Sequence, residues 1–273
     1  MTLDPRTQKA HQGTIMDQAL TLAKPDDIKR PVLALRNVQK QFAGITAIQS
    51  FNLEIMPGEI VALVGDNGAG KSTLIKIIAG VFPPTSGQIA VDGEDVHFTN
   101  PRQSQDRGIQ VVFQDLALAD SQPVYMNMFL GREKVKGPLR RLDRRGMINE
   151  TEELVRALDV RIPSARVKIR DLSGGQRQGV AIARATHWAG KLVLMDEPTA
   201  ALGVAETARV EHNIKTLKAQ NRAILIISHN LDQVFRLADR ICVLRRGVQV
   251  GIKRTSETTN NEIVSMITGL SSS

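Results

Sequence analysis

A glycine-rich stretch early in the chain, GDNGAGKST, contains the residue types needed to hold a phosphate group. It fits the pattern G-x-x-x-x-G-K-[ST], in which glycines let backbone N–H groups turn toward a phosphate. The lysine supplies charge for the β- and γ-phosphate oxygens, and the next hydroxyl can bind Mg²⁺. The apolar run IVALV precedes the stretch and the helical pattern KSTLIKIIA follows it. We therefore predict a nucleotide-binding loop made of Gly65, Asp66, Asn67, Gly68, Ala69, Gly70, Lys71, Ser72 and Thr73.

Polar side chains follow several other apolar runs. Asp196 and Glu197 end KLVLMDE, Gln114 ends IQVVFQ, and His229 ends RAILIISH. In a parallel sheet the carboxyl ends of the strands line the ligand crevice. We expect Asp196 to hold Mg²⁺ through water and Glu197 to be the general base, or the group that orients the attacking water. Gln114 would reach the metal or that water, and His229 would contact the γ-phosphate.

These residues require a sheet whose strands run in one direction. Apolar runs such as EIVALVG, KLVLMDEP and RAILIISH alternate with helical patterns such as ETARVEHNIKTLKAQN. That alternation is typical of βαβ units and a parallel sheet, so we predict an α/β fold. The section from about 115 to 187 contains helical patterns and no strand signal, which indicates a mainly helical section.

The ends of the chain carry weaker patterns. Residues 1–30 lack periodicity, and we expect a flexible leader there. The catalytic domain is expected to span 31–255 and a C-terminal tail to occupy 256–273. The single cysteine, Cys242, lies in an apolar run and is expected to be a buried structural thiol.

Composition limits the class of protein. Among the 273 residues 42% are hydrophobic, and no apolar run is long enough to span a bilayer. The N-terminal segment lacks the apolar core of a signal peptide, so a cytosolic location is expected. The net charge is +8, and seven Lys or Arg face two acids in GREKVKGPLRRLDRRGM. Because no aromatic residue interleaves with that run, a base-stacking surface is not expected and a solvated segment is favoured.

A second phosphate-binding pattern occurs in DLSGGQRQGVAIARA, where a serine and two glycines precede a helical pattern. Such a helix N-terminus is suited to face a phosphate. The phosphate loop, Gln114, LSGGQ, LVLMDE and His229 occur in an order that resembles the ATP-binding subunits of ABC transporters. The resemblance covers about residues 32–255.

The resemblance implies a P-loop NTPase core of RecA-like type, with an N-terminal antiparallel β subdomain and an inserted helical subdomain. It implies ATP and Mg²⁺ as ligands, with adenine stacked on Phe42. It also implies a head-to-tail dimer in which Ser173, Gly174, Gly175 and Gln176 close over the γ-phosphate held by a second copy of the chain. A groove beside Gln114 would receive a helix of a membrane permease. The chain would then lie peripherally at the cytoplasmic face of the inner membrane.

Finer features resemble the simple-sugar importers, with the single-domain fructose importer ATPase nearest. They are NMFLGRE, EPTAALG and SHNLDQVF. A periplasmic sugar-binding protein is then implied as an indirect partner, and no nucleic acid is expected. One departure is Gly203, where family members commonly carry Asp, so coupling between the two ATP sites is in question. A soluble ABC ATPase acting on nucleic acid or ribosomes, or the ATPase of an exporter, is the alternative function.

Overall fold

The computed structural model describes residues 30–200 and 202–270. The expected leader therefore lies outside the described residues, apart from Arg30. Ala201, in the loop that follows Glu197, also lies outside them.

A six-stranded sheet forms the centre of the molecule, in the order β12-β11-β3-β10-β9-β6. Neighbouring strands are parallel, except that the edge strand β12 runs antiparallel to β11. The predicted α/β fold with a parallel sheet is thus confirmed. The strands are β3 (Ile60–Val64), β6 (Ile109–Val112), β9 (Leu192–Asp196), β10 (Ala223–Ile227), β11 (Arg240–Arg245) and β12 (Val248–Arg254).

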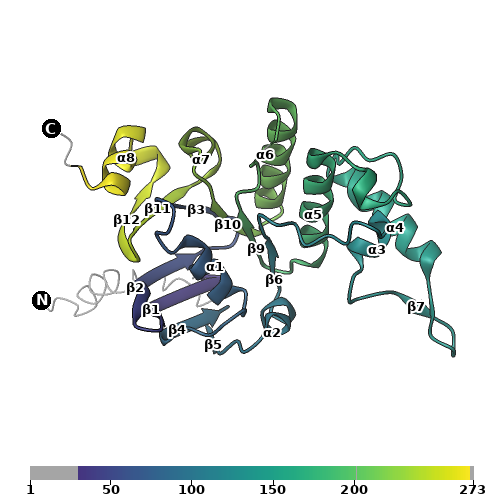
Figure 1. The fold of residues 1–273 in the computed structure, drawn as a ribbon, viewed down its shortest axis with the longest axis horizontal. Helices are drawn as coiled ribbons and strands as arrows, with labels where there is room; N and C mark the ends of the chain where they lie inside the picture. The colour runs from purple at the N-terminus through teal and green to yellow at the C-terminus, as the bar shows by residue number, and fades with distance from the viewer. Residues whose placement is uncertain (1–29, 201, 271–273) are drawn as a thin grey trace, which may run out of the picture.

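Strands β3, β9 and β10 are buried along their whole length because both faces of the sheet are covered. Alternate residues of each strand enter two separate apolar layers. One layer packs against α1 (Lys71–Ile78) and the N-terminal strands. The other packs against α5 (Gly174–Trp188), α6 (Val204–Ala219) and α7 (Leu231–Leu237). Figure 1 shows the sheet between these two layers.

An antiparallel sheet of four strands lies beside α1, in the order β2-β1-β4-β5. Its hydrophobic residues continue the first apolar layer, which includes the buried Phe51 and Ile48. The expected N-terminal antiparallel subdomain is thus present. Its strands are β1 (Leu33–Phe42), β2 (Ile45–Ile55), β4 (Ser86–Val91) and β5 (Glu94–Val96), and the short helix α2 (Pro101–Asp106) follows them.

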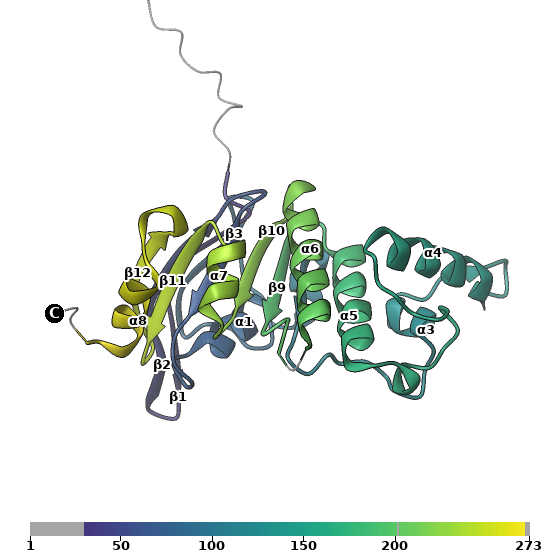
Figure 2. The ribbon, with the colours of Figure 1, turned by 90° about the horizontal axis from the view of Figure 1, so that it is seen from above.

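A helical subdomain occupies the other end of the long axis, as Figures 1 and 2 show. It contains α3 (Val124–Met128), α4 (Arg144–Ala157), a 3-10 turn (Ile169–Asp171) and α5. These elements have a small core of their own around Phe129, Met147 and Val180. Two strands of two residues, β7 (Val135–Lys136) and β8 (Arg141–Leu142), add a hairpin that the sequence did not predict, since runs this short carry no period.

Buried Asn127 fixes the connection between the sheet and the helical subdomain. Its side chain is fully buried, accepts a hydrogen bond from the Ala119 N–H at 2.7 Å and donates to the Ala119 carbonyl at 3.2 Å. It also donates to the carbonyls of Gln122 and Pro123. The stretch NMFLGRE therefore contains a residue that ties the backbone of residues 119–123 to α3.

The expected C-terminal tail contains a packed helix. Helix α8 (Asn260–Thr268) follows a 3-10 turn (Thr255–Glu257) and buries Ile263 against the second apolar layer. Only the amphipathic stretch NEIVSMI suggests this helix in the sequence, and its packing partners lie on distant strands. Cys242 is buried as expected, and burial raises the pKa of its thiol to about 12.

Candidate functional site

The glycine-rich loop lies between β3 and α1, where the sequence predicted it. Gly70 is the N-cap residue of α1 and has a φ of 106°, in the left-handed region that favours glycine. A Cβ atom on Gly65 would lie 1.9 Å from the Leu244 carbonyl oxygen, so only glycine fits there. Lys71 Nζ donates to the carbonyls of Gly65 and Asp66 at 2.6 and 2.9 Å. An ammonium group has three donors, so one N–H remains available to a phosphate oxygen.

Ser72 and Asp196 meet at the end of the central sheet. The Ser72 hydroxyl donates to Asp196 Oδ2 at 3.3 Å, although the two residues are far apart in the sequence. Burial raises the pKa of Asp196, while the Ser72 hydrogen bond and the charge of Lys71 act in the opposite direction. Burial also lowers the pKa of Lys71, and the nearby carboxylates of Glu197 and Asp196 oppose that shift. A phosphate-bound cation and polyphosphate would satisfy both groups at once.

Glu197 and His229 form the second close contact of the site. His229 Nδ1 lies 2.8 Å from Glu197 Oε2, and the glutamate side chain is only 15% exposed while that of His229 is 75% exposed. Glu197 has a φ of 52°, an unfavourable backbone conformation for this residue type. Its N–H donates to the Ile227 carbonyl at 3.0 Å, which anchors it to the end of β10. Strain of this kind is often found where a side chain must point in one direction for function.

Gln233 joins the two loops that carry these side chains. Its side chain is 1% exposed, and its Oε1 accepts hydrogen bonds from the hydroxyls of Thr199 and Ser228, each at 3.1 Å. Asn230 caps the same helix, α7, by accepting from the Gln233 N–H at 3.1 Å. The loop after Glu197 and the loop of His229 are therefore held against each other. No local pattern indicates this role of Gln233, because its partners come from separate loops.

Gln114 and Phe42 lie at the edges of this arrangement. Strand β6 pairs in parallel with β9, with Val112 opposite Met195, so Gln114 follows the same sheet edge as Asp196. Its side chain is exposed. Phe42, which is 43% exposed, packs edge-on against Phe82 with ring centroids 5.3 Å apart. The Lys40 ammonium lies 5.0 Å from the Phe42 ring centroid.

The LSGGQ residues form the N-terminus of α5 in the helical subdomain. Ser173 and Gln176 make a capping box, in which each side chain accepts a hydrogen bond from the backbone N–H of the other. Ser173 and Gly174 are exposed to solvent. In the described part of the chain no hydrogen bond or ion pair joins residues 173–176 to the phosphate loop. One chain therefore does not bring its two phosphate-binding patterns together.

Glu206 links the LSGGQ residues to the loop after Glu197. A Cβ atom on Gly175 would lie 2.4 Å from Glu206 Cγ, so the side chain packs directly against that glycine. Gly203 is the N-cap residue of α6 and supplies no side-chain cap. A Cβ atom there would lie 2.7 Å from Glu206 Oε2. The carboxylate of Glu206 thus occupies the space beside Gly203.

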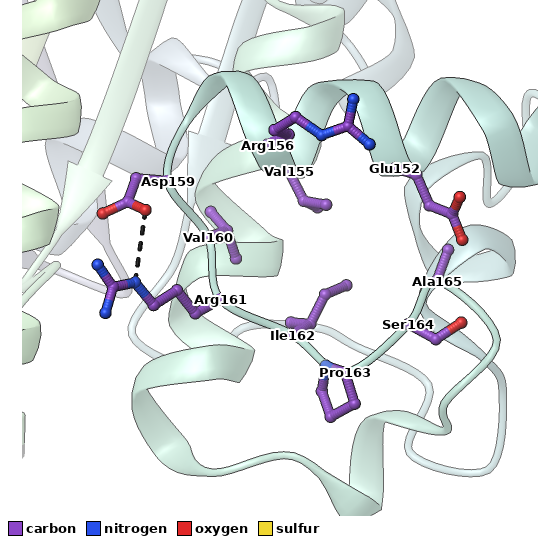
Figure 3. A pocket seen from close by; sticks show the side chains of 10 residues that line it. All are labelled: Glu152, Val155, Arg156, Asp159, Val160, Arg161, Ile162, Pro163, Ser164 and Ala165. Carbon is purple, nitrogen blue, oxygen red and sulfur yellow. Dashed lines mark hydrogen bonds and ion pairs between the residues drawn. The ribbon is translucent and has the colours of Figure 1, made fainter.

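Two shallow hollows flank residues 159–161, beside the same helix N-terminus. One contains Ser173, Gly175 and Gln176 in its lining, with a volume of about 160 Å³. The other, of about 320 Å³, lies between the end of α4 and residues 160–165. Figure 3 shows Asp159 and Arg161 facing each other at its edge, and their ion pair measures 3.5 Å. The surface around LSGGQ is therefore concave and open to solvent.

Arg184 connects α5 to the loop that follows Gln114. Its guanidinium donates to the carbonyls of Leu116 and Ala117, both at 2.9 Å. Ala117 has a φ of 48°, so the loop is held in a conformation that its own residues do not favour. Two hydrogen bonds therefore connect the helix that begins at LSGGQ to the loop after Gln114. No local pattern indicates this role of Arg184, because ARA is typical of an ordinary helix interior.

We expect Arg184→Gln to lower the rate of nucleotide hydrolysis roughly tenfold while nucleotide affinity changes by less than about twofold, because the loop carbonyls lose their donors but the phosphate loop is untouched. Steady-state kinetics and direct nucleotide binding measure the two effects separately. Arg156→Gln, on the exposed surface of α4, is the matched control. An equal loss of affinity and rate would contradict a positioning role.

No helix within 30–200 and 202–270 is both long and apolar enough to cross a membrane. Over the same ranges no three His, Cys, Asp or Glu side chains gather as a metal-binding cluster. Mg²⁺ takes few protein ligands and keeps several waters beside substrate phosphates, so a hydroxyl and one carboxylate suit its usual binding mode.

The phosphate loop, the carboxylates at the strand ends and the parallel sheet define a P-loop NTPase. The family model described as "ABC transporter" matches residues 48–200. The chain therefore belongs to the ABC transporter family and carries its ATP-binding domain.

The similar proteins are named as import ATP-binding proteins. A xylose/arabinose import ATP-binding protein of Sulfolobus acidocaldarius is 44% identical over 87% of this chain and 94% of its own length. A fructose import ATP-binding protein of Rhizobium meliloti is 39% identical over 88% of this chain and 95% of its own. The sequence resemblance favoured the fructose importer, yet the xylose/arabinose protein is the more similar of these two. A ribose import ATP-binding protein of Clostridium tetani is 36% identical, and the match covers 48% of that longer protein.

Solved structures agree on the fold. An ATP-binding cassette of an ABC transporter in its ADP conformation superposes with a TM-score of 0.76 at 25% identity, covering 88% of this chain and 99% of that one. A cassette solved as a dimer, bound to ADP and phosphate after hydrolysis, gives a TM-score of 0.71 at 26% identity, covering 82% and 98%.

Proposed function

We propose that the chain is the ATP-hydrolysing subunit of an ABC importer that takes up a monosaccharide. The observation that carries this proposal is the convergence of the phosphate loop with Asp196, Glu197 and His229 at one sheet edge. Two relatives that match over nearly their whole length are named as xylose/arabinose and fructose import ATP-binding proteins. Their names support import as the direction of transport and a monosaccharide as the substrate.

ATP would bind with its phosphates in the loop 65–73 and its adenine stacked on Phe42. The three donors of Lys71 support contact with the β- and γ-phosphates, because only two of them are used within the loop. Phe82 and Lys40 hold the ring of Phe42 from neighbouring positions, which supports a preset stacking surface. Stacking on one ring uses the face of the base and reads little of its edge.

Ser72 and Asp196 would hold Mg²⁺, which supplies charge neutralisation on the phosphates when bound. Their side-chain oxygens already lie 3.3 Å apart, and Asp196 is largely buried. A buried carboxylate with a raised pKa is the kind of group that gains from a bound cation. Gln114 would complete this side of the site, either at the metal or at the attacking water.

Glu197 would accept a proton from the attacking water, or would orient that water for attack. Its carboxylate has one oxygen in contact with His229 Nδ1, so the other oxygen is the one directed to water. With its Nδ1 facing Glu197, His229 presents Nε2 to the γ-phosphate. Positioning and charge neutralisation provide the catalysis in this class of reaction, and no covalent intermediate is needed.

A head-to-tail dimer would complete each site with Ser173, Gly174, Gly175 and Gln176 of a second copy. The exposure of Ser173 and Gly174, and their lack of contact with the phosphate loop of their own chain, support this arrangement. The similar ATP-binding cassette that was solved as a dimer further supports a dimeric arrangement.

A helix of a permease would lie in the groove beside Gln114, and closure of the dimer would move that helix. The chain would be bound peripherally to the cytoplasmic face of the membrane. The bonds from Arg184 and Asn127 to the loop after Gln114 support a rigid connection from that groove to LSGGQ. A periplasmic sugar-binding protein would deliver the sugar to the permease. No sugar contact is assigned to this chain.

The test is purification of the tagged chain from membranes, followed by ATP hydrolysis in proteoliposomes that contain the co-purified permease and its binding protein. We expect a polytopic membrane protein in the preparation, and hydrolysis that rises with one of xylose, arabinose, fructose or ribose. Co-purification with RNA or ribosomes, and hydrolysis stimulated by RNA instead, would overturn the proposal.

A further inference from the structure

A basic hairpin projects from the helical subdomain, at the end of the molecule farthest from the antiparallel sheet. We define it as residues 131–145, which include β7, β8 and the turn between them. Figure 1 and Figure 2 both place it beyond α4, away from the phosphate loop. Neither the nucleotide site nor the proposed dimer contact uses it.

The two faces of the basic hairpin differ in chemistry. Val135 pairs with Leu142 and Lys136 pairs with Arg141. Because side chains of a strand alternate between faces, one face carries the apolar pair and the other the basic pair. Val135 is 42% exposed and Leu142 is 40% exposed, while Leu139 at the turn is 73% exposed. Apolar surface is therefore presented to solvent at the tip.

Four arginines of the basic hairpin carry uncompensated charge. Lys134 pairs with Glu150 and Lys136 pairs with Asp143, so those two cations are neutralised. Four further side chains are exposed and form no ion pair within residues 30–200 and 202–270, namely Arg140, Arg141, Arg144 and Arg145. The patch combines concentrated positive charge with exposed aliphatic groups.

The base of the hairpin is anchored, so its tip has a defined direction. The Asp143 N–H donates to the Lys134 carbonyl at 2.8 Å. The Arg132 guanidinium lies 4.8 Å from the Trp188 ring centroid, at the last residue of α5. An anchored surface loses less conformational freedom on binding than a free loop would.

Three kinds of anionic or membrane partner differ in their fit to this patch. Single-stranded nucleic acid needs aromatic side chains for stacking, and the basic hairpin contains none. Cytoplasmic loops of membrane proteins carry an excess of Lys and Arg, so a permease surface would repel these arginines. Anionic lipid headgroups attract clustered arginines, and the boundary between headgroups and acyl chains accepts aliphatic side chains.

We propose that the basic hairpin binds the anionic phospholipid surface of the membrane, with Arg140 and Arg141 at the phosphates and Leu139 inserted at the headgroup boundary. The choice of membrane over other anions rests on the proposed membrane location of the chain. This contact would add a second attachment beside the permease and fix the orientation of the helical subdomain relative to the bilayer.

The test is flotation of the purified chain with phosphatidylcholine vesicles, made with and without phosphatidylglycerol. We expect binding only with phosphatidylglycerol and a decrease as salt is raised. The double variant Arg140→Glu with Arg141→Glu should weaken binding by roughly tenfold or more. Leu139→Ser should weaken it less, and by an amount that salt does not change. ATP turnover in solution should stay at the wild-type rate in both variants.

The matched control is Arg102→Glu with Lys215→Glu, which changes the net charge equally at exposed positions on α2 and α6. Retained vesicle binding by this control supports the proposal. Equal loss in control and hairpin variants, equal binding to neutral vesicles, or tighter binding of the hairpin to RNA than to vesicles would each overturn it. Because no permease is present and turnover is measured separately, failure here is distinguishable from failure of the importer assignment.

Discussion

Replacing Glu197 with Gln should lower ATP turnover by about a hundredfold or more while leaving ATP affinity within about twofold, which is the size expected for loss of a general base. Glutamine has nearly the shape of glutamate and can still accept a hydrogen bond from His229 Nδ1, whose present distance to the carboxylate is 2.8 Å. The loop geometry and the left-handed backbone at this position are therefore retained. The substitution removes the proton-accepting carboxylate together with its negative charge.

Phosphate release and equilibrium binding of a fluorescent ATP analogue measure the two quantities. Glu153→Gln is the matched control, since it removes a carboxylate at an exposed position of α4, outside the proposed sites. The Glu197→Gln variant should also accumulate an ATP-bound dimer, because in the proposed dimer ATP between the two copies would hold them together until it is cleaved. Turnover close to the wild-type rate in Glu197→Gln would mean that another group activates the water.

Replacing Ser173 with Arg should abolish the ATP-dependent dimer and lower turnover by about a hundredfold, with ATP binding to the monomer unchanged. In the proposed dimer the long side chain would stand where the γ-phosphate of the partner's ATP enters. It would lie at the start of α5, away from the phosphate loop of its own chain. Sedimentation velocity in the Glu197→Gln background detects the dimer directly, because hydrolysis does not deplete it.

A second substitution separates crowding from loss of the helix cap. Ser173 accepts a hydrogen bond from the Gln176 N–H at 3.3 Å, and removal of such a cap costs about 1 kcal/mol. Ser173→Ala also loses the cap but leaves the space open, so it should retain much of the dimer. An ATP-dependent dimer that persists in Ser173→Arg would contradict the shared site. Equal loss in both variants would assign the effect to the cap.

Local sequence determined the parts of the fold that depend on neighbouring residues. The run IVALV, followed by the glycines and KSTLIKIIA, specifies a buried strand, a tight loop and a helix within one short segment. Continuous apolar runs identified β9 and β10 as strands covered on both faces. Polar residues at their ends indicated the site, since the carboxyl ends of parallel strands share one edge.

Other features depend on residues that are distant in sequence, so only the tertiary structure decided them. The connection of Arg184 to the carbonyls of Leu116 and Ala117 joins two segments that share no local pattern. The four bonds of Asn127 exist because its side chain is buried under a particular loop. The packing of α8 on β11 and β12 could not follow from a short amphipathic stretch alone.

The two phosphate-binding patterns show most directly which features follow from local sequence and which follow from tertiary packing. Their residue types alone determine that GDNGAGKST and LSGGQ are both suited to phosphate, because each places free backbone N–H groups at a helix N-terminus. Their separation within one chain was decided by the tertiary structure, in which α5 packs in the helical subdomain and α1 packs against the opposite face of the sheet. Packing sets the distance between two helix ends, and no local preference of either segment can encode it.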